Sequence, residues 1–253
     1  MTLNKVVIFI SVLFLLIQGS AIAASTDACY DTTDTVLMLH TDGTDASTTF
    51  TDSDAAKTVT ANGNAQIDTA QSKFGGASGL FDGTGDYLSV ADSTDWDFGT
   101  GDFTVDFWVR FNTTGNQTLI DIGGYAGGVM LETAGGNLDA YIAGTAVGTL
   151  GTWTWTPSTG TWYHVAIARN GTNLRAFING SQIGSTVTNS SNITGTTAGV
   201  YVGFRTDGFF YVDGWIEELR IVKGTAVWTA NFTPASAAYT DCSAAGGRKR
   251  MLI

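Results

Sequence analysis

The stretch that decides the fold is Phe103-Thr-Val-Asp-Phe-Trp-Val-Arg-Phe111. Its apolar residues recur at every second position, and one face collects Phe103, Val105, Phe107, Val109 and Phe111. The other face collects Thr104, Asp106, Trp108 and Arg110. A period of two over this length indicates a β-strand, because successive side chains of a strand point to opposite faces. We therefore expect a strand whose aromatic face lies in a hydrophobic core.

The same logic predicts further strands on both sides of this stretch. They are Val36–Leu39, Gly79–Phe81, Tyr87–Val90, Thr118–Ile122, Leu138–Ile142, Trp162–Ala168, Leu174–Ile178, Val200–Phe204 and Trp215–Val222. Turn pairs such as Asn170-Gly171 and Asp213-Gly214 separate many of them. With no amphipathic helix between these short strands, the sequence predicts an all-β protein with two antiparallel sheets packed face to face.

The two ends of the chain differ from its middle. Residues 1–23 have a positive Lys5, an apolar run over 6–17 and the small-x-small pattern of Ala21-Ile22-Ala23, which is typical of a signal peptide. We therefore expect a secreted or periplasmic protein, with one domain over residues 24–242. Residues 243–253 are expected to form a flexible basic tail.

The charge of the chain excludes some partners. It has 12 Lys and Arg against 23 Asp and Glu, a formal net charge of −11. Nucleic acid is a poor partner because binding to its phosphates rests on clustered Lys and Arg. No apolar run reaches the ~20 residues that a membrane-spanning helix needs, so we expect no membrane insertion.

The two cysteines, Cys29 and Cys242, lie near the two ends of the expected domain. In an oxidising compartment such a pair is expected to form a disulfide, which requires the two ends to lie side by side. Lipid attachment at Cys29 does not fit, because the preceding Thr26-Asp27-Ala28 has two polar residues and lacks the Leu of a lipoprotein signal.

Several motifs of the chain resemble a known family. In order they are Gly79-Leu-Phe-Asp-Gly-Thr-Gly-Asp-Tyr-Leu-Ser-Val90, Asp102-Phe-Thr-Val-Asp-Phe-Trp-Val-Arg110, Thr161-Trp-Tyr-His-Val-Ala166, Phe177-Ile-Asn-Gly180 and Gly214-Trp-Ile-Glu-Glu-Leu-Arg-Ile221. Over residues 34–238 the chain resembles the laminin-G-like, concanavalin A-like jelly-roll superfamily, in its pentraxin-like branch. The resemblance implies a two-sheet jelly-roll sandwich and binding more often than catalysis.

Catalytic motifs are missing from the sequence. A glycan-cleaving member of this superfamily needs two carboxylates at the scissile bond, often as Glu-x-Asp-x-Glu on one strand, and the chain has no such run. Glu217 and Glu218 are adjacent and would point to opposite faces of a regular strand. His164 is expected to be structural and His40 to lie at a loop edge. Asp pairs across loops keep a glycoside hydrolase or polysaccharide lyase open as an alternative.

Calcium is the one cofactor that the resemblance implies. Members of the superfamily hold a calcium between an N-terminal loop and the last strand, where the pattern is Ile-Asp-Glu-Val-Arg-Ile. The chain has Ile216-Glu-Glu-Leu-Arg-Ile221 there, so Glu217 replaces the usual Asp. The expected ligands of a structural calcium are Glu217, Asp42 and the carbonyl groups around Asp82 and Gly83, because calcium prefers carboxylate and carbonyl oxygens. The alternative is that the Asp-Gly pairs only make turns.

Aromatic side chains are the expected sugar-binding residues, because the apolar face of a sugar stacks on an aromatic ring. The first candidates are Trp153 and Trp155, which share a face in a polar stretch expected to be rich in loops. Next come Phe209 and Tyr211, beside Asp207-Gly208, and then Trp108 and Arg110. For each of these residues, packing within the fold is the competing interpretation.

The sequence thus predicts a secreted, non-catalytic binding module whose partner is a glycan or surface polysaccharide. The second hypothesis is a structural or adhesive protein of a cell or virion surface with a protein partner. The hydrolase or lyase comes third.

Overall fold

The computed structural model describes residues 29–30, 33–124, 127–142, 149–194, 198–208 and 210–241, with the backbone alone at 29–30 and 149–152. In these residues the regular elements are β-strands and one short 3-10 helix, η1 (Thr94–Trp96). No helix within these ranges has the length and apolar character needed to cross a membrane.

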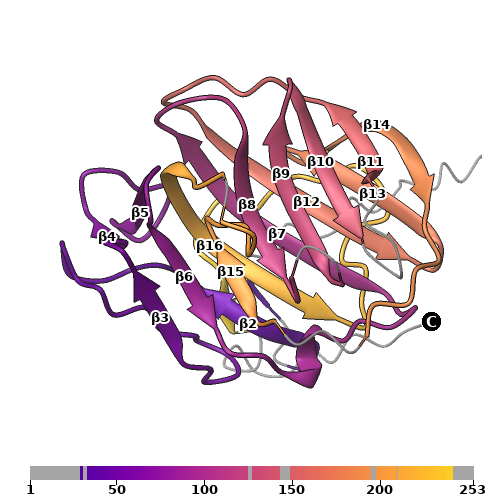
Figure 1. Cartoon of the computed structure of the whole chain (residues 1–253), viewed down its shortest axis with the longest axis horizontal. Helices are drawn as coiled ribbons and strands as arrows, with labels where there is room; N and C mark the ends of the chain where they lie inside the picture. The colour runs from indigo at the N-terminus through magenta and orange to yellow at the C-terminus, as the bar shows by residue number, and fades with distance from the viewer. Residues whose placement is uncertain are drawn as a thin grey trace, which may run out of the picture.

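The strands form two main antiparallel sheets, drawn as two layers in Figure 1. The seven-stranded sheet has the order β11 (Thr149–Thr154), β10 (Asn137–Ile142), β9 (Val129–Ala134), β8 (Gln117–Ile122), β15 (Val200–Val202), β6 (Tyr87–Val90) and β3 (Val59–Asn62). The eight-stranded sheet has the order β14 (Ser181–Thr188), β13 (Asn173–Ile178), β12 (Trp162–Asn170), β7 (Phe103–Phe111), β16 (Asp213–Lys223), β5 (Ser78–Asp82) and β4 (Gln66–Asp68), with β2 (Thr35–Leu39) also paired to β16. The expected all-β jelly-roll sandwich is therefore confirmed.

Strand β7 lies at the centre of the eight-stranded sheet, between β12 and β16. All five residues of its aromatic face are fully buried between the sheets, as the period-two pattern predicts. The other face is also largely buried: Asp106 is 0% and Trp108 6% exposed. Something must therefore cover the outer side of this sheet as well.

That cover is the C-terminal strap, by which we mean residues 224–239. Trp228 and Phe232 of the strap stack on each other with ring centroids 3.9 Å apart. Both rings meet the ring of His164, on β12, edge-on at 5.6 Å. Tyr239, at the end of the strap, is 4% exposed. The strap therefore closes part of the outer face of the eight-stranded sheet.

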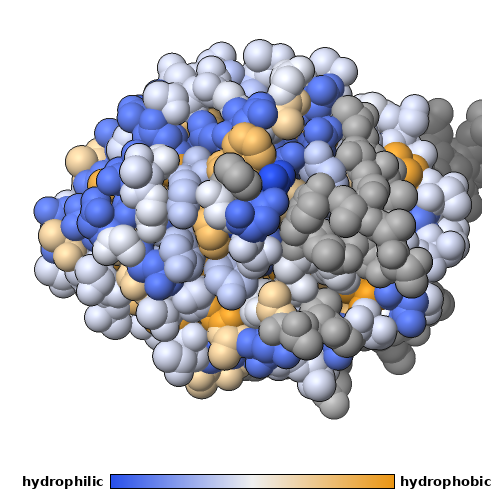
Figure 2. Space-filling model, in the orientation of Figure 1, coloured by the Kyte–Doolittle hydropathy of each residue, from blue (hydrophilic) through white to orange (hydrophobic). Residues whose placement is uncertain are grey.

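The outer face of the seven-stranded sheet is partly covered by the β15–β16 loop, residues 203–212. The backbone N–H and the Oγ1 of Thr206 both donate to Oδ2 of Asp121, on β8, at 3.1 and 2.9 Å. The backbone carbonyl of Phe210 accepts the N–H of Thr118 at 2.8 Å. These bonds fix the loop over β8. On the face of the molecule shown in Figure 2, apolar residues form small separate patches.

The described ends of the domain lie side by side. Strand β1 (Cys29–Tyr30) pairs in parallel with β17 (Thr240–Asp241), and Cys29 is opposite Thr240. Cys242 lies outside the described residues, so the disulfide stays a prediction. The expected signal peptide and basic tail lie outside them too.

Candidate functional site

The two tryptophans expected to stack on sugar are core residues. Trp153 is 1% exposed, and its Nε1 donates to the carbonyl of Ser185 at 3.0 Å. Trp155 is 8% exposed, and its ring meets Phe111 and Tyr163 edge-on. The stretch is not the loop that its polar composition suggests, because strand β11 pairs with β10 there. With both rings buried in the core, the structure does not support their predicted role.

A different set of rings forms an aromatic patch on the seven-stranded sheet. We define this aromatic patch as Tyr87, Tyr201, Phe204 and Tyr211, all half-buried. Phe204 stacks on Tyr87 at 4.6 Å and on Tyr211 at 4.9 Å between ring centroids. The ring centroids of Tyr201 and Tyr87 lie 6.1 Å apart, and the two ring planes are inclined by 42°. The patch contains one predicted ligand-binding residue, Tyr211, while Phe209 lies outside the described residues.

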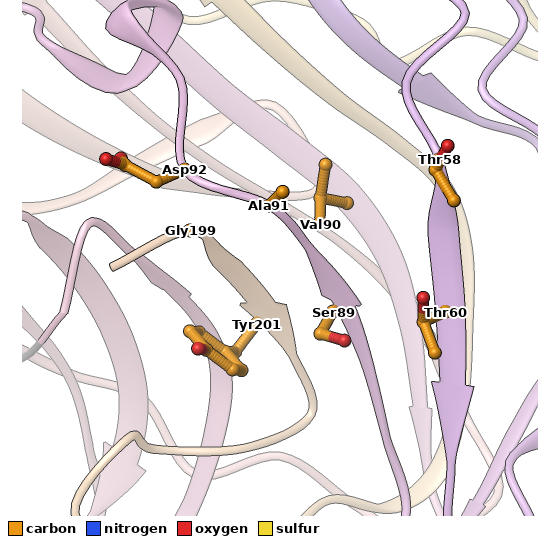
Figure 3. A pocket seen from close by; sticks show the side chains of 8 residues that line it. All are labelled: Thr58, Thr60, Ser89, Val90, Ala91, Asp92, Gly199 and Tyr201. Atoms are coloured by element: carbon orange, nitrogen blue, oxygen red, sulfur yellow. The ribbon is translucent and has the colours of Figure 1, made fainter. Parts of the chain in front are cut away.

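A hollow of about 330 Å³ adjoins the aromatic patch and shares Tyr201 with it (Figure 3). Its lining consists of Thr58, Thr60, Ser89, Val90, Ala91, Asp92, Gly199 and Tyr201. Thr60, Ser89 and Tyr201 form one row across three neighbouring strands, because Ser89 pairs with both other residues. The hollow thus combines one aromatic ring with hydroxyl groups and a carboxylate, which can exchange hydrogen bonds with a polyhydroxylated ligand.

Three carboxylates lie on β8, β9 and β10 of the same sheet. Asp139 of β10 is directly opposite Glu132 of β9, and Asp121 of β8 is directly opposite Tyr201. The guanidinium of Arg205, from the β15–β16 loop, reaches Oε2 of Glu132 at 3.5 Å. The three acids are 9%, 4% and 0% exposed respectively, so they lie beneath the surface and not on it.

The protonation of two of these acids is governed by burial. Burial raises the pKa of Asp121, against the two hydrogen bonds from Thr206 that lower it. Burial likewise raises the pKa of Glu132, while Tyr141 and Arg205 lower it. Both effects follow from the cost of holding a carboxylate charge away from water.

Trp108 and Arg110 lie on the opposite side of the molecule, on the outer face of the eight-stranded sheet. The core between the two sheets separates these two residues from the aromatic patch. Arg110 places its guanidinium 4.9 Å from the ring centroid of Trp215. The structure therefore divides the predicted ligand-binding residues between two outer faces and the core.

The predicted metal ligands are only partly brought together. Glu217 and Asp42 are close enough for their charges to interact, and the carboxylate of Asp42 packs against Gly75. Asp82 is opposite Asp213, four residues before Glu217 on β16, which is about 13 Å along a strand. In the described parts of the chain no group of three or more His, Cys, Asp or Glu could hold a metal ion. The set of Asp42, Asp82 and Glu217 therefore does not form.

The expectation that Glu217 and Glu218 diverge as in a regular strand also needs correction. The register of β16 with β7 shifts between Glu217 and Arg220, and Glu218 has φ of 55°. Glu217 accepts the backbone N–H groups of Lys73 and Phe74 at 2.5 and 2.6 Å. Glu218 accepts from the N–H of Tyr239 at 2.6 Å and lies 2.8 Å from Nδ1 of His40. The bulge thus lets each glutamate anchor a different segment.

Sequence reasoning missed three of the four residues of the aromatic patch. A signal for two of them exists: Tyr201 alternates with Val200 and Val202, and Tyr87 precedes Leu88 in the same way. A ring out of phase with buried aliphatic residues points away from the core. Phe204 belongs to a loop, and no periodicity in the sequence predicts its contact with Tyr87.

Solved structures of similar fold include a domain of an arabinanase and parts of botulinum neurotoxins. Domain 4 of AbnA, an extracellular arabinanase from Geobacillus stearothermophilus in complex with arabinotriose, matches with a TM-score of 0.58 and 21% identity, over 76% of this chain and 94% of that one. The receptor binding domain of a botulinum neurotoxin C/D mosaic serotype matches with a TM-score of 0.58 and 17% identity, over 78% of this chain. A structure of botulinum neurotoxin type C, a toxin whose cell entry depends on interaction with two ganglioside molecules, matches with a TM-score of 0.58 and 16% identity over 78% of this chain. The match spans 49% of each of these two toxin chains.

The sequence itself matches a family model over residues 82–228, which is more than half of the chain. This range includes β7, the aromatic patch and the β15–β16 loop. No curated protein matches the sequence. The matched model and the two-sheet architecture agree, and the chain belongs to the concanavalin A-like lectin/glucanases superfamily.

Proposed function

We propose that this protein is an exported, non-catalytic module that binds carbohydrate on the outer face of the seven-stranded sheet, at Tyr201. The observation that carries the proposal is the half-buried aromatic patch beside a hollow lined by hydroxyl groups. Monomeric proteins seldom leave several aromatic rings together at the surface unless the rings contact a partner.

The chemistry of the hollow suits a neutral sugar. The C–H face of a sugar ring would pack on the ring of Tyr201, which lies next to the row of Ser89 and Thr60. The hydroxyl groups of these two residues both donate and accept hydrogen bonds, as do sugar hydroxyls. Asp92, which is exposed at the same hollow, adds an acceptor.

The similar structures support the proposal by analogy. One of them was solved with arabinotriose, and another concerns ganglioside binding. With identities of 21% and 16%, the likeness shows the fold alone, so the ligand has to be argued from the residues of this chain.

We propose that the protein is not catalytic because a bound sugar chain cannot reach a suitable pair of carboxylates. Hydrolysis of a glycosidic bond needs two carboxylates at the bond. Glu132 and Asp139 are directly opposite on adjacent strands, where side chains lie roughly 5 Å apart. They are 4% and 9% exposed, however, beside the loop that carries Arg205. A sugar chain on the aromatic patch would not reach them unless that loop moved, and reducing-sugar release from mixed polysaccharides tests this.

Export and the disulfide belong to the same proposal. The disulfide is supported by the β1–β17 ladder, in which Cys29 pairs with Thr240, two residues before Cys242 in the sequence. Mass spectrometry of the protein recovered from the periplasm or medium tests both. The expected product begins near Ala24 and carries Cys29 linked to Cys242.

The glycan site is tested with a glycan array, followed by titration with arabino-oligosaccharides and the best array ligand. Tyr201→Ala should weaken binding by roughly tenfold, about 1.4 kcal/mol, because the stacking surface is lost. The matched control is Trp228→Ala, which removes a half-buried ring from the C-terminal strap on the other outer face and lines neither hollow. If the Tyr201→Ala variant binds the glycan as tightly as the unmodified protein does, the site is not at Tyr201.

A protein partner is the second candidate. The same aromatic patch could contact a protein, since aromatic residues are enriched at interfaces. No binding on the array, together with co-purification of a cell-surface or virion protein that Tyr201→Ala abolishes, would favour this structural or adhesive role.

We also propose a structural calcium held by Asp42 and Glu217 with backbone carbonyl oxygens. Calcium takes six to eight oxygen ligands, many of them carbonyls, so two carboxylates can suffice. Asp42 and Glu217 come from the loop after β2 and from β16, and an ion between them would cross-link these segments. Both oxygens of Glu217 already accept N–H groups, which leaves one lone pair of each oxygen for an ion.

A further inference from the structure

The outer face of the eight-stranded sheet carries a second aromatic row. Trp162 of β12 is directly opposite Arg110 of β7, and Arg110 is directly opposite Trp215 of β16. All three side chains are half-buried. The guanidinium of Arg110 lies over Trp215, whose Nε1 donates to Oδ2 of Asp68 at 2.6 Å. The C-terminal strap leaves this row accessible.

A hollow of about 370 Å³ lies beside the row, on the same face. Its lining consists of Lys73, Trp108, Trp162, Asn179, Pro234, Ala235 and Ser236, so the strap forms one wall. Trp108 is 6% exposed, and its buried Nε1–H has no hydrogen-bond partner. Because this nitrogen is closed to solvent, Trp108 contributes its ring and not its N–H to the hollow.

The cation of this hollow is Lys73. Its Nζ lies 4.2 Å from the ring centroid of Trp108 and 5.5 Å from that of Phe74. The backbone N–H of Lys73 donates to Glu217, which fixes the position of the residue independently of its side chain. The ammonium group is therefore held at the hollow by contacts that need no carboxylate partner.

Lys73 and Arg110 make no ion pair among the described residues. Other cations of the chain do, in the pairs Lys57–Asp95, Arg205–Glu132 and Arg220–Asp106. Neither Lys73 nor Arg110 is thus neutralised by direct contact with a carboxylate. Both can pair with an anionic ligand.

Asn179 adds an amide donor to the hollow. Oδ1 of Asn179 accepts the backbone N–H of His164 at 2.9 Å, which leaves the Nδ2 amide group for a ligand. The two nearby carboxylates are turned to protein donors: Glu217 binds the backbone of residues 73–74, and Asp68 binds Trp215. No carboxylate lines the hollow itself.

We propose that this hollow is a second binding site, specific for a saccharide that carries a carboxylate, such as a uronic acid unit. The sugar ring packs on Trp162, and its carboxylate accepts from the ammonium of Lys73 and the Nδ2 amide group of Asn179. Arg110 contacts the carboxylate of a neighbouring unit in an oligomer. This site is independent of the neutral-sugar site at Tyr201, because it lies on the other outer face.

The test uses two probes with the same sugar backbone, oligogalacturonate and its fully methyl-esterified form. Titration calorimetry and quenching of tryptophan fluorescence measure both. The acidic oligomer should bind at least about tenfold more tightly than the ester, because esterification removes the charge and keeps the ring. Acetate and inorganic phosphate, as competitors, distinguish a saccharide site from a general anion site.

Four variants locate the site. Lys73→Gln and Trp162→Ala should each weaken oligogalacturonate binding by about tenfold. Lys223→Gln removes the same charge from the far end of β16, where Nζ bonds only the carbonyl of Thr94, and should change little. Tyr201→Ala should leave this binding unchanged while it weakens neutral-glycan binding, so the two sites can fail separately.

Three results would overturn the proposal. The first is equal affinity for the acidic and esterified oligomers. The second is unchanged affinity of Lys73→Gln in a variant whose circular dichroism and unfolding midpoint match those of the unmodified protein. The third is displacement of the bound oligomer by acetate or phosphate when the concentration of either ion equals that of the oligomer's carboxylates.

Discussion

Arg220 donates from Nε to Oδ1 of Asp106 at 2.9 Å, within the outer face of the eight-stranded sheet. Oδ2 of Asp106 accepts from the hydroxyl of Tyr239 at 2.8 Å and lies 3.3 Å from Nε2 of His164. Burial alone would raise the pKa of Asp106, but Arg220 and His164 outweigh it and lower the pKa. An ionised carboxylate thus ties the C-terminal strap to the sheet.

Replacing Asp106 with Ala should cost about 3–5 kcal/mol of unfolding free energy, because it leaves the charge of Arg220 buried without its partner. Tyr239→Phe keeps the ring and loses one hydrogen bond to a charged group, about 1.5–3 kcal/mol. Urea unfolding followed by circular dichroism measures both. A loss below about 1 kcal/mol for Asp106→Ala would show that the network does not hold the strap.

Gly184 should be essential for the packing of Trp153. The Gly184 backbone has φ of 57°, and a Cβ there would lie 2.4 Å from Cδ1 of Trp153. Gly171 has the same φ and open space around it, so Gly171→Ala is the matched control. Both variants carry roughly 1–2 kcal/mol of backbone strain, and Gly184→Ala should add about 1–3 kcal/mol from overpacking. Equal unfolding midpoints in urea would mean that Trp153 is not tightly packed.

Most of the central strands could be predicted from the sequence, but the central strand β9 and the edge strands β11 and β14 were not. Strand β7 has the predicted bounds because its aromatic face is buried without a break. Strand β14 has an exposed, mostly polar sequence, so pairing with β13 defines it and periodicity does not. Strand β11 carries Trp153 among Thr and Gly residues that resemble a loop. Edge strands face water on part of their surface, which weakens the apolar alternation.

The candidate sites depend on contacts between distant parts of the chain. Trp108 and Lys73 meet because Glu217 binds the backbone of Lys73, and no local pattern contains this information. Arg110 could be predicted as outward-facing from its phase in β7. Its neighbours Trp162 and Trp215 follow only from the register of β12 and β16. Sequence periodicity gives the face of a residue, whereas register gives its neighbours.

Calcium should stabilise the protein through Asp42 if the proposed ion binds there. At 100 times the dissociation constant, a bound ion adds about 2.7 kcal/mol, which thermal unfolding detects. Asp42→Asn should abolish the calcium-dependent rise in Tm, and Asp82→Asn should leave it unchanged, because Asp82 lies away from Glu217. No rise in Tm and no heat in calorimetry of chelator-treated protein would remove calcium from the proposal.

The stability of the calcium-free protein should fall as the pH rises from about 5 to 8. Burial raises the pKa of Glu217 to about 8, and the charges of Glu218 and Asp42 add to this against the N–H bonds from Lys73 and Phe74. The unfolded chain releases the same proton near its ordinary pKa of 4.5. Between these values the folded state binds more protons, so raising the pH favours unfolding by up to about 1.4 kcal/mol per pH unit.

The variant Glu217→Gln should flatten this dependence, because its amide has no proton to release in that range. His40 leaves a smaller slope of the same sign: burial lowers its pKa, but the hydrogen bond and charge of Glu218 outweigh burial and raise it. The measurement is urea unfolding at pH 5, 6, 7 and 8 with a chelator present. Asp92→Asn removes an exposed carboxylate and should keep the full slope. A Glu217→Gln profile parallel to that of the unmodified protein would mean that Glu217 is already ionised at pH 5, and that the two N–H bonds outweigh its burial.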